Sequence, residues 1–410
     1  MRSLRSPRLV GYLLPFLVGA CGAVETNLID EDDALPEDGR LSNALVAAEA
    51  VATESSGSFG HAAESDTLLV SGIAAPRPVT TTDEQVHLVY ELLVENVSDT
   101  GQRITQLDVF EGGRRAPLLS FSGDALQAIL ISNEVTGNIA PGTFALLFLD
   151  VAFALDAPLP GRLQHRFQRE AEGVVGGVVE RGPSVPVMRE RALRVGAPLR
   201  GNGLVDVNGC CRPGGHTTAL LASEEGELFL AQRYAIDFLQ QEELSSFRGD
   251  PSDNASYFIF GDDVLAAAGG RIVAVGDGAA ENVPNQELPP FDNDTAAGNH
   301  VVQALGDGRF ALYAHLQPGS LRVRVGERVR RGQVLGLVGN TGNSTEPHLH
   351  FQVTDGPSPL LSNGLPYVFD RFHLEGHVEV SDTGLVLIPT PGPERRENRL
   401  PLDLDVIAFR

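Results

Sequence analysis

Short apolar runs separated by clusters of turn-forming residues recur along most of this 410-residue chain. Residues 86–94 and 144–151 are two such runs, and the turn clusters 98–101, 111–113 and 140–142 lie between them. Runs of this length, bounded by Gly, Pro, Asn, Asp or Ser, are typical of β-strands. The 45 glycines and 26 prolines favour many short strands joined by tight turns over a helical bundle. The sequence therefore predicts an all-β fold.

Changes of composition divide the chain into two folded regions. The rhythm of short strands from 67 to 207 predicts an N-terminal antiparallel β-sandwich. From 208 to 387 the glycine content rises, and residues 323–336 open with alternating branched apolar and basic side chains, the period of a half-buried strand. These features predict a second, antiparallel β-sheet domain. Residues 388–410, rich in Pro and Arg, are expected to form a C-terminal tail that either wraps around this domain or trails from it.

The first twenty residues have the composition of an export signal. Arg2, Arg5 and Arg8 precede a short apolar run, and small residues come directly before Cys21. This order is typical of a secretory signal peptide over residues 1–20. It also resembles a bacterial lipobox, in which the cysteine becomes the lipid-bearing first residue of the mature protein. The alternative is a plain signal peptide followed by an incidental cysteine.

The residues that follow Cys21 bear on the location of the protein. Acyl chains on this cysteine would hold the protein on a membrane without a spanning helix. Gly22, rather than an acidic residue, comes next, and the resemblance to lipoproteins of double-membraned bacteria implies the outer membrane, facing the periplasm. Residues 21–66 are acidic and poor in large apolar side chains, which predicts a disordered tether. We therefore expect an extracytoplasmic, lipid-anchored protein.

The formal net charge of −23 restricts the possible partners. Binding to nucleic acid depends on Lys and Arg side chains that neutralise phosphates, so this charge argues against a nucleic-acid partner. It argues equally against polybasic association with a membrane surface. Solubility of an extracytoplasmic chain is a sufficient explanation for the acidity. The charge thus excludes classes of partner without naming one.

Three histidines stand in a setting that suggests chemistry. His348 and His350 are two residues apart, so on a strand their side chains share one face. A glycine-containing turn at 339–345 precedes them, and His315 ends an earlier apolar run. One imidazole of such a cluster can bind a metal ion while another reaches a water on it. His87, His165 and His300, by contrast, are expected to be structural or strand-facing residues.

These motifs resemble those of the lysostaphin-like, or LytM-type, zinc peptidases. The shared residues are Tyr-Ala-His-Leu at 313–316, Gly-Asn-Thr-Gly at 339–342 and Pro-His-Leu-His-Phe at 347–351, within a match that covers about a third of the chain. The resemblance implies an antiparallel β-sheet peptidase domain that binds Zn²⁺ and cuts peptide bonds, most often in bacterial peptidoglycan. It also implies that His350 binds zinc and that His315 and His348 form the catalytic pair.

The family's remaining ligands form a His-x-x-x-Asp motif on an earlier strand. Asp237 matches its carboxylate, but Arg233 occupies the histidine position, and a guanidinium offers no lone pair to zinc. A hairpin turning near residue 225 would place His216 opposite Tyr234 and close to the metal. We therefore expect His216, Asp237 and His350 to bind zinc, with water in the fourth tetrahedral position. The alternative is that His216 is an outer-sphere or turn residue.

Arg233 leaves further alternatives open. It can pair with Asp237 or with an outer carboxylate, bind a substrate carboxylate, or fill the metal site and abolish activity. The adjacent Cys210 and Cys211 form either a vicinal disulfide or two thiols, and the family uses neither as a ligand. The leading hypothesis is a zinc metalloendopeptidase acting on cell-wall peptides. The alternative is a non-catalytic relative that binds or activates another cell-wall enzyme.

Overall fold

The computed structural model describes most of the chain beyond the expected export signal. The predicted signal peptide (1–20), the lipid-bearing Cys21 and most of the predicted tether lie outside the described residues. Within those residues no helix is long and apolar enough to cross a membrane. The described residues are 59–64, 67–132, 137–223, 226–288, 292–381 and 384–410.

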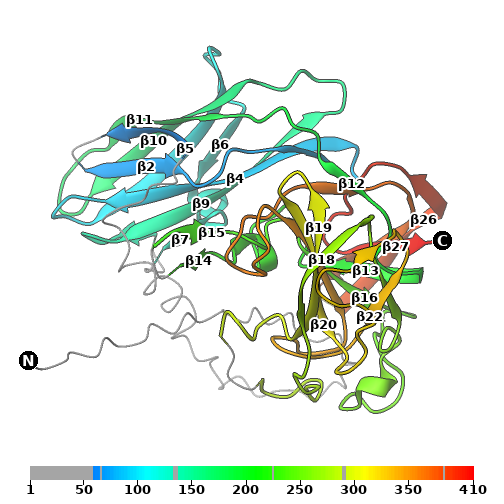
Figure 1. Cartoon of the computed structure of the whole chain (residues 1–410). Coiled ribbons are helices and arrows are strands. Elements are labelled where there is room, and N and C mark those ends of the chain that lie inside the picture. The colour runs from blue at the N-terminus through cyan, green and yellow to red at the C-terminus, as the bar shows by residue number, and fades with distance from the viewer. Residues whose placement is uncertain (1–58, 65–66, 133–136, 224–225, 289–291, 382–383) are drawn as a thin grey trace, which may run out of the picture.

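The N-terminal region is the predicted antiparallel sandwich, and Figure 1 shows it beside the second sheet. Two layers are joined through β1 into one sheet of order β6-β5-β10-β11-β1-β2-β4-β9-β7, with β3 on β4 and β8 on β5. The elements are β1 (Phe59–Glu64), β2 (Leu68–Gly72), β3 (Pro78–Thr80), β4 (Gln85–Asn96), β5 (Gln102–Glu111), β6 (Leu119–Ser122), α2 (Gly123–Gln127), β7 (Leu130–Ser132), β8 (Asn138–Ile139), β9 (Phe144–Ala154), β10 (Arg162–Ala171) and β11 (Val178–Pro186).

The sequence of β4 is a continuous apolar run rather than an alternating one, and the packing of the strand gives the reason. Leu88, Tyr90 and Leu92 point into the sandwich core. Val89 and Leu93, on the opposite face, pack into clusters that include residues of the second domain. Both faces of the strand are therefore buried, as in sheets that are covered on two sides.

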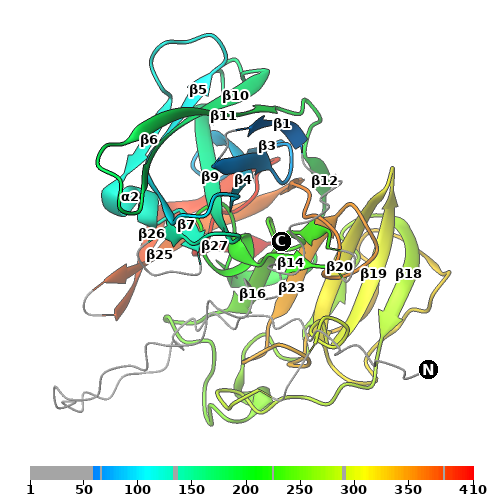
Figure 2. The ribbon, with the colours of Figure 1, turned by 90° about the vertical axis from the view of Figure 1, so that its left-hand side faces the viewer.

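The second region is built on a ten-stranded antiparallel sheet of order β21-β18-β19-β20-β23-β16-β13-β27-β25-β26. Figure 2 shows this sheet below the sandwich. Its strands are β13 (Gly201–Val207), β16 (Ile236–Gln240), β18 (Gly270–Gly276), β19 (Asn299–Gly306), β20 (Arg309–Leu316), β21 (Arg328–Val329), β23 (Leu349–Thr354), β25 (Phe372–Ser381), β26 (Gly384–Arg396) and β27 (Asp405–Phe409).

Smaller elements complete the second region. The strands β12 (Leu193–Val195) and β24 (Tyr367–Phe369) form the one parallel pair among the strand pairs of the described residues. The antiparallel pairs are β14 (Leu221–Ala222) with β15 (Leu228–Phe229) and β17 (Asp263–Leu265) with β22 (Val334–Leu337). Two 3-10 turns are η1 (Gly215–Thr218) and η2 (Asn254–Ser256). The all-β fold class is thus confirmed.

Three of the predicted boundaries differ from the structure. β1 falls within the predicted tether, yet its backbone pairs with β2 and β11, and such pairing does not need large apolar side chains. β13 falls within the predicted sandwich segment but pairs with β16 and β27. The predicted tail contains most of β26 and all of the buried β27, which lies inside the sheet rather than trailing from it.

Candidate metal centre and catalytic residues

Three neighbouring strands bring the expected residues together. Asp237 on β16 lies directly opposite His350 on β23, and His350 in turn lies opposite Ala314 on β20. His315 follows Ala314, and His348 stands just before β23. Residues far apart in the sequence therefore meet because antiparallel pairing fixes which positions face each other.

The Asp237 carboxylate is the centre of this cluster. Its Oδ1 lies 2.8 Å from His350 Nδ1 and 3.4 Å from His348 Nε2. Its Oδ2 lies 3.1 Å from His216 Nε2 and accepts a 3.0 Å hydrogen bond from the Asn208 amide. The ligand atoms of His216, Asp237 and His350 all lie within 4.8 Å of one another. His216 and His350 are buried, and the Asp237 side chain is 13% exposed.

His216 reaches the cluster by a different local structure from the one expected. The predicted hairpin register is present, because Leu221 pairs with Phe229. If this antiparallel pairing continued for five more residues, His216 would lie opposite Tyr234. The pairing ends at Leu221, however, and His216 lies in the 3-10 turn η1. Its Nδ1 atom is buried and has no hydrogen-bond partner among the described residues.

A hydrogen bond on the side of the ring that faces away from Asp237 orients His350. Its Nε2 lies 2.9 Å from Gln352 Oε1, and Gln352 is held by a 2.7 Å hydrogen bond to the Pro359 carbonyl. With the Gln352 oxygen accepting, the proton of a neutral His350 lies on Nε2 and the lone pair lies on Nδ1. That nitrogen faces Asp237, so the tautomer is the one that a metal ion requires.

His315 and His348 form a second pair beside the first set. Their ring centroids are 4.6 Å apart, and both residues are buried. Nδ1 of His315 lies 2.7 Å from the Thr341 carbonyl oxygen, and Nδ1 of His348 lies 2.8 Å from the Glu346 carbonyl oxygen. Each ring can donate from Nδ1 to a carbonyl, which leaves Nε2 free to accept a proton.

The glycine-containing turn at 339–345 fixes His315. Thr341 donates from Oγ1 to the Leu316 carbonyl and accepts from the Asn299 amide. Gly298, at φ +55, packs so closely on Thr341 that a Cβ atom would lie 2.4 Å from its carbonyl carbon. His315 itself has φ +65, a left-handed conformation that costs free energy in a non-glycine residue and persists only where the surroundings enforce it.

Charge and burial set the protonation of the cluster. Burial alone would raise the pKa of Asp237, but the facing His216 and His348 outweigh it and hold that pKa well below its usual value. Burial, together with His348 and His350, lowers the pKa of His315 well below its usual value. Burial alone would lower the pKa of His348, but Asp237 raises it. The centre is thus an ionised carboxylate surrounded by imidazole nitrogens.

Arg233 turns away from this cluster. Its guanidinium donates two 2.7 Å hydrogen bonds to the carboxylate of Glu91 on β4, and a third of 3.1 Å to the Gly364 carbonyl. Of the alternatives that the sequence left open, the structure shows pairing with an outer carboxylate. The Arg233 side chain therefore joins the two domains and does not enter the Asp237 cluster, which His216 reaches instead.

The donor set fits a divalent metal ion. A buried carboxylate that faces imidazole nitrogens of two further residues offers ligand atoms of the kinds that zinc prefers. The buried, unpartnered Nδ1 of His216 shows that hydrogen bonds within the described residues do not fully satisfy this ring.

The remaining cysteine and histidine predictions have definite outcomes. Cys210 and Cys211 form a vicinal disulfide. His165 is buried between the Tyr90 hydroxyl and the Pro183 carbonyl, each 2.8 Å away, as expected of a structural histidine. His300 contacts the Gly298 carbonyl at 2.8 Å. His87, also expected to be structural, pairs with Asp150 and lies in a group with Cys211 that only the fold reveals.

Comparison with known proteins identifies one stretch of the chain. Residues 257–361, which include His315, His348 and His350, match the model of Peptidase family M23. Peptidoglycan DD-endopeptidase ShyA of Vibrio cholerae is 30% identical over 189 residues, which cover 43% of this chain and 41% of that protein. Peptidoglycan DD-endopeptidase ShyC of the same organism is 36% identical over 92 residues, covering 22% of this chain and 19% of that protein.

The match to these relatives is partial. The chain spans 41% of the length of ShyA and 19% of that of ShyC. Among solved structures, the catalytic domain of the prophage-encoded M23 protein EnpA from Enterococcus faecalis is 21% identical, with 42% of this chain and 93% of that chain covered and a TM-score of 0.25. The sequence matches, rather than this low structural score, identify the domain.

Proposed function

The chain carries a Peptidase family M23 domain, and on that premise we propose that it is a zinc-dependent metalloendopeptidase that hydrolyses peptide bonds in bacterial peptidoglycan. The observation that carries the proposal is the Asp237 carboxylate, which faces His216, His348 and His350 at 2.8–3.4 Å with His315 beside them. A scaffold protein would need none of these buried polar groups, since burying each one costs free energy.

His216, Asp237 and His350 are the residues that would hold the metal. Two further side chains orient them: Asn208 donates to Asp237, and Gln352 accepts from His350. Zinc bound there would polarise the scissile carbonyl and lower the pKa of a bound water to about 7. Three protein ligands leave the fourth position open, which is the arrangement of catalytic rather than structural zinc sites.

His315 and His348 would move the protons. Both rings are anchored at Nδ1 by backbone carbonyls, so both present Nε2 to the space beside Asp237. As a pair, they can accept a proton from the attacking water, deliver it to the leaving amine and stabilise the negative charge that develops on the carbonyl oxygen. Their rigid anchoring favours catalysis because no reorientation is needed during the reaction.

The direct test is hydrolysis of purified peptidoglycan sacculi by residues 22–410, the mature chain without its lipid-bearing Cys21, which is the form meant by the mature chain in the experiments below. Soluble muropeptides should appear, should disappear with a chelator and should return with added Zn²⁺. The His348→Ala variant should bind zinc and release no product. Zinc binding without any release of product, from sacculi of several bacteria, would contradict the enzymatic proposal.

A second candidate function rests on Arg233. Its presence at a usual zinc-ligand position favours a non-catalytic relative that binds or activates another cell-wall enzyme. The contacts of Arg233 with Glu91 weaken this candidate, because they keep the guanidinium away from Asp237. A mature chain that binds sacculi, holds no zinc and stimulates a separate hydrolase would support it.

The proposed location follows from the sequence alone. We propose a lipid anchor at Cys21 and a position on the outer membrane, facing the periplasm, where peptidoglycan is the neighbouring polymer. Radiolabelled palmitate should enter the wild-type protein and be absent from the Cys21→Ala variant. Label in that variant, or none in either protein, would contradict the anchor.

A further inference from the structure

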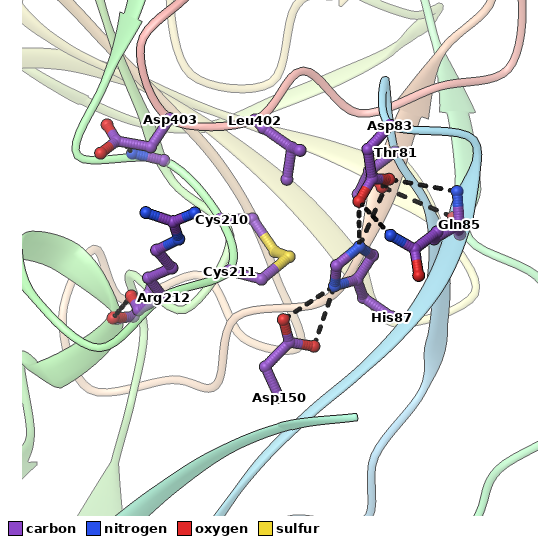
Figure 3. The surroundings of a disulfide bond; sticks show 12 residues. Thr81, Asp83, Gln85, His87, Asp150, Cys210, Cys211, Arg212, Leu402 and Asp403 are labelled. Atoms are coloured by element: carbon purple, nitrogen blue, oxygen red, sulfur yellow. Dashed lines mark hydrogen bonds and ion pairs between the residues drawn. A yellow bond between two sulfur atoms is a disulfide. The ribbon is translucent and has the colours of Figure 1, made fainter. Parts of the chain in front are cut away.

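A second group of metal-ligating side chains lies where the sandwich meets the loop that leads to His216. His87 on β4, Asp150 on β9 and Cys211 place one ligand atom each within 4.8 Å of the others. Figure 3 shows the Cys210–Cys211 disulfide beside the His87 and Asp150 side chains. Nitrogen, oxygen and sulfur donors therefore converge from three separate segments of the chain.

His87 is held in the orientation that a metal ligand needs. Its Nδ1 faces both oxygens of Asp150, at 2.9 and 2.8 Å, and its Nε2 lies 3.1 Å from Asp83 Oδ2. A carboxylate that accepts from the far nitrogen of a histidine fixes the tautomer and raises the basicity of the near nitrogen. Asp83 stands in that relation to His87, and Nδ1 is the nitrogen that points toward the cluster.

The group is more buried than an ordinary surface ion pair. His87 is 6% exposed and Cys211 is 5% exposed. The His87 imidazole lies between the carboxylates of Asp83 and Asp150, so acidic groups outnumber the histidine at this place. Burial raises the pKa of Asp150, and the facing His87 opposes this only in part. A divalent cation would offset the charge of the two carboxylates.

We propose that Cys211, His87 and Asp150 form a second metal site, which binds a borderline-soft divalent ion such as Zn²⁺ when the Cys210–Cys211 disulfide is reduced. The ligands would be the Cys211 thiolate, His87 Nδ1 and an Asp150 oxygen, a set that suits zinc. In the disulfide form, the Cys211 sulfur is bonded to Cys210 and has no thiolate to offer. Oxidation and metal binding therefore exclude each other at this site.

A dithiol reductant can supply the electrons and protons that reduction of the disulfide requires. Two electrons and two protons pass from the dithiol to the Cys210–Cys211 bond, which breaks to give two thiols, and the reductant becomes a disulfide. Metal binding then displaces the proton of the Cys211 thiol and any proton on His87 Nδ1. The reverse sequence, metal loss and oxidation by a disulfide donor, restores the form seen in the structure.

The position of the site connects it to the proposed catalytic centre. The segment from Asn208 to His216 contains the disulfide and carries, at its two ends, the amide that donates to Asp237 and the expected ligand His216. A metal ion at Cys211 would tie this segment to β4 and β9 of the sandwich. The inference concerns a separate site and does not require that the Asp237 centre be active.

The experiment is a Co²⁺ titration of the metal-free mature chain. Thiolate bound to Co²⁺ gives an intense ligand-to-metal absorption in the near ultraviolet, whereas the nitrogen and oxygen ligands of the Asp237 centre give none. The Cys210→Ser variant cannot form the disulfide, so it should show the thiolate band without any reductant. Wild-type protein should show the band after reduction by a phosphine and lose it after reoxidation.

Further variants separate this site from metal binding by thiols alone. His87→Gln and Asp150→Asn, each combined with Cys210→Ser, should abolish the band at stoichiometric Co²⁺. Asp83→Asn in the same background should weaken Co²⁺ binding about 10–100-fold, and the matched control Glu84→Gln should not. No band in either Cys210→Ser or reduced wild type, both shown to be folded by circular dichroism, would overturn the proposal. A band unchanged by His87→Gln and Asp150→Asn would also overturn it.

Discussion

Arg233 of the peptidase region and Glu91 of the sandwich form a fully buried ion pair, in which the guanidinium donates two hydrogen bonds of 2.7 Å to the carboxylate. The side chains are only 4% and 1% exposed. Arg233 stands four residues before Asp237, at the position where the resemblance to zinc peptidases implies a histidine ligand. In this chain that position holds the two domains together, because paired charges are what makes burial of a guanidinium tolerable.

Changing Glu91 to Gln should destabilise the protein strongly. The variant leaves the Arg233 charge buried without its partner, which typically costs about 3–5 kcal/mol. Chemical unfolding of the mature chain, followed by circular dichroism, measures the change. Glu170→Gln is the matched control, since its pair with Arg103 is roughly half exposed and is worth about 0–1 kcal/mol. Equal effects of the two substitutions would contradict this account of the interface.

His165 should make the sandwich sensitive to acid. Burial lowers the pKa of His165 from 6.5 to about 4, although a hydrogen bond to the Pro183 carbonyl partly opposes this. The native state therefore resists a proton that the unfolded state binds, and stability is lost as the pH falls from 6.5 towards 4. Between pH 7.5 and 4.5 the wild type should lose about 2–3 kcal/mol more unfolding free energy than His165→Gln. Equal losses, or a larger loss in the variant, would refute the assignment.

The fold class could be predicted because strand length and turn residues are local properties. The sandwich strands β4 and β9 correspond to the apolar runs at 86–94 and 144–151. The boundaries could not be predicted in the same way. β13 and β27 pair with each other although the paired residues are more than 200 positions apart, and a pairing over that distance leaves no local signal.

Substitution of His315 or His348 should lower the catalytic rate and leave the zinc content unchanged. Each substitution by Ala removes a proton-transfer group that lies beside the ligand set, so kcat on a peptidoglycan substrate should fall about 10²–10⁴-fold. Zinc content should stay at the wild-type value, because neither ring belongs to the group of His216, Asp237 and His350. Metal analysis beside the rate assay distinguishes the two roles. Loss of zinc in either variant would show that the ring is a ligand.

Gln352 should act through His350. Its oxygen is 2.9 Å from His350 Nε2, so Gln352→Ala removes the partner that fixes the tautomer. Zinc affinity, measured by competition with a chromogenic chelator, should fall about 10–100-fold. Gln303→Ala serves as a control for loss of a buried glutamine, since Gln303 bonds to Tyr313 and the Ala268 carbonyl instead. An unchanged affinity in Gln352→Ala would contradict the orienting role.

The candidate site was predictable only in part. His315, His348 and His350 lie in motifs that are specific in order and spacing, and Asp237 could be placed by its match to the aspartate of the His-x-x-x-Asp motif. His216 was inferred from a hairpin whose register was right but whose pairing stops short of it. The roles of Glu91 and His87 could not be predicted, because their contacts with Arg233 and Cys211 cross between the domains.

Zinc per chain in the mature wild-type protein and its His216→Ala variant, measured after dialysis under oxidising conditions, tests the central claim most directly. With the disulfide intact, the wild type should hold one zinc and His216→Ala should hold little or none, while the control His300→Ala should match the wild type. One zinc retained at unchanged affinity in His216→Ala would contradict the proposed ligand set, and no zinc in the wild type after incubation with the metal would contradict the metallopeptidase itself.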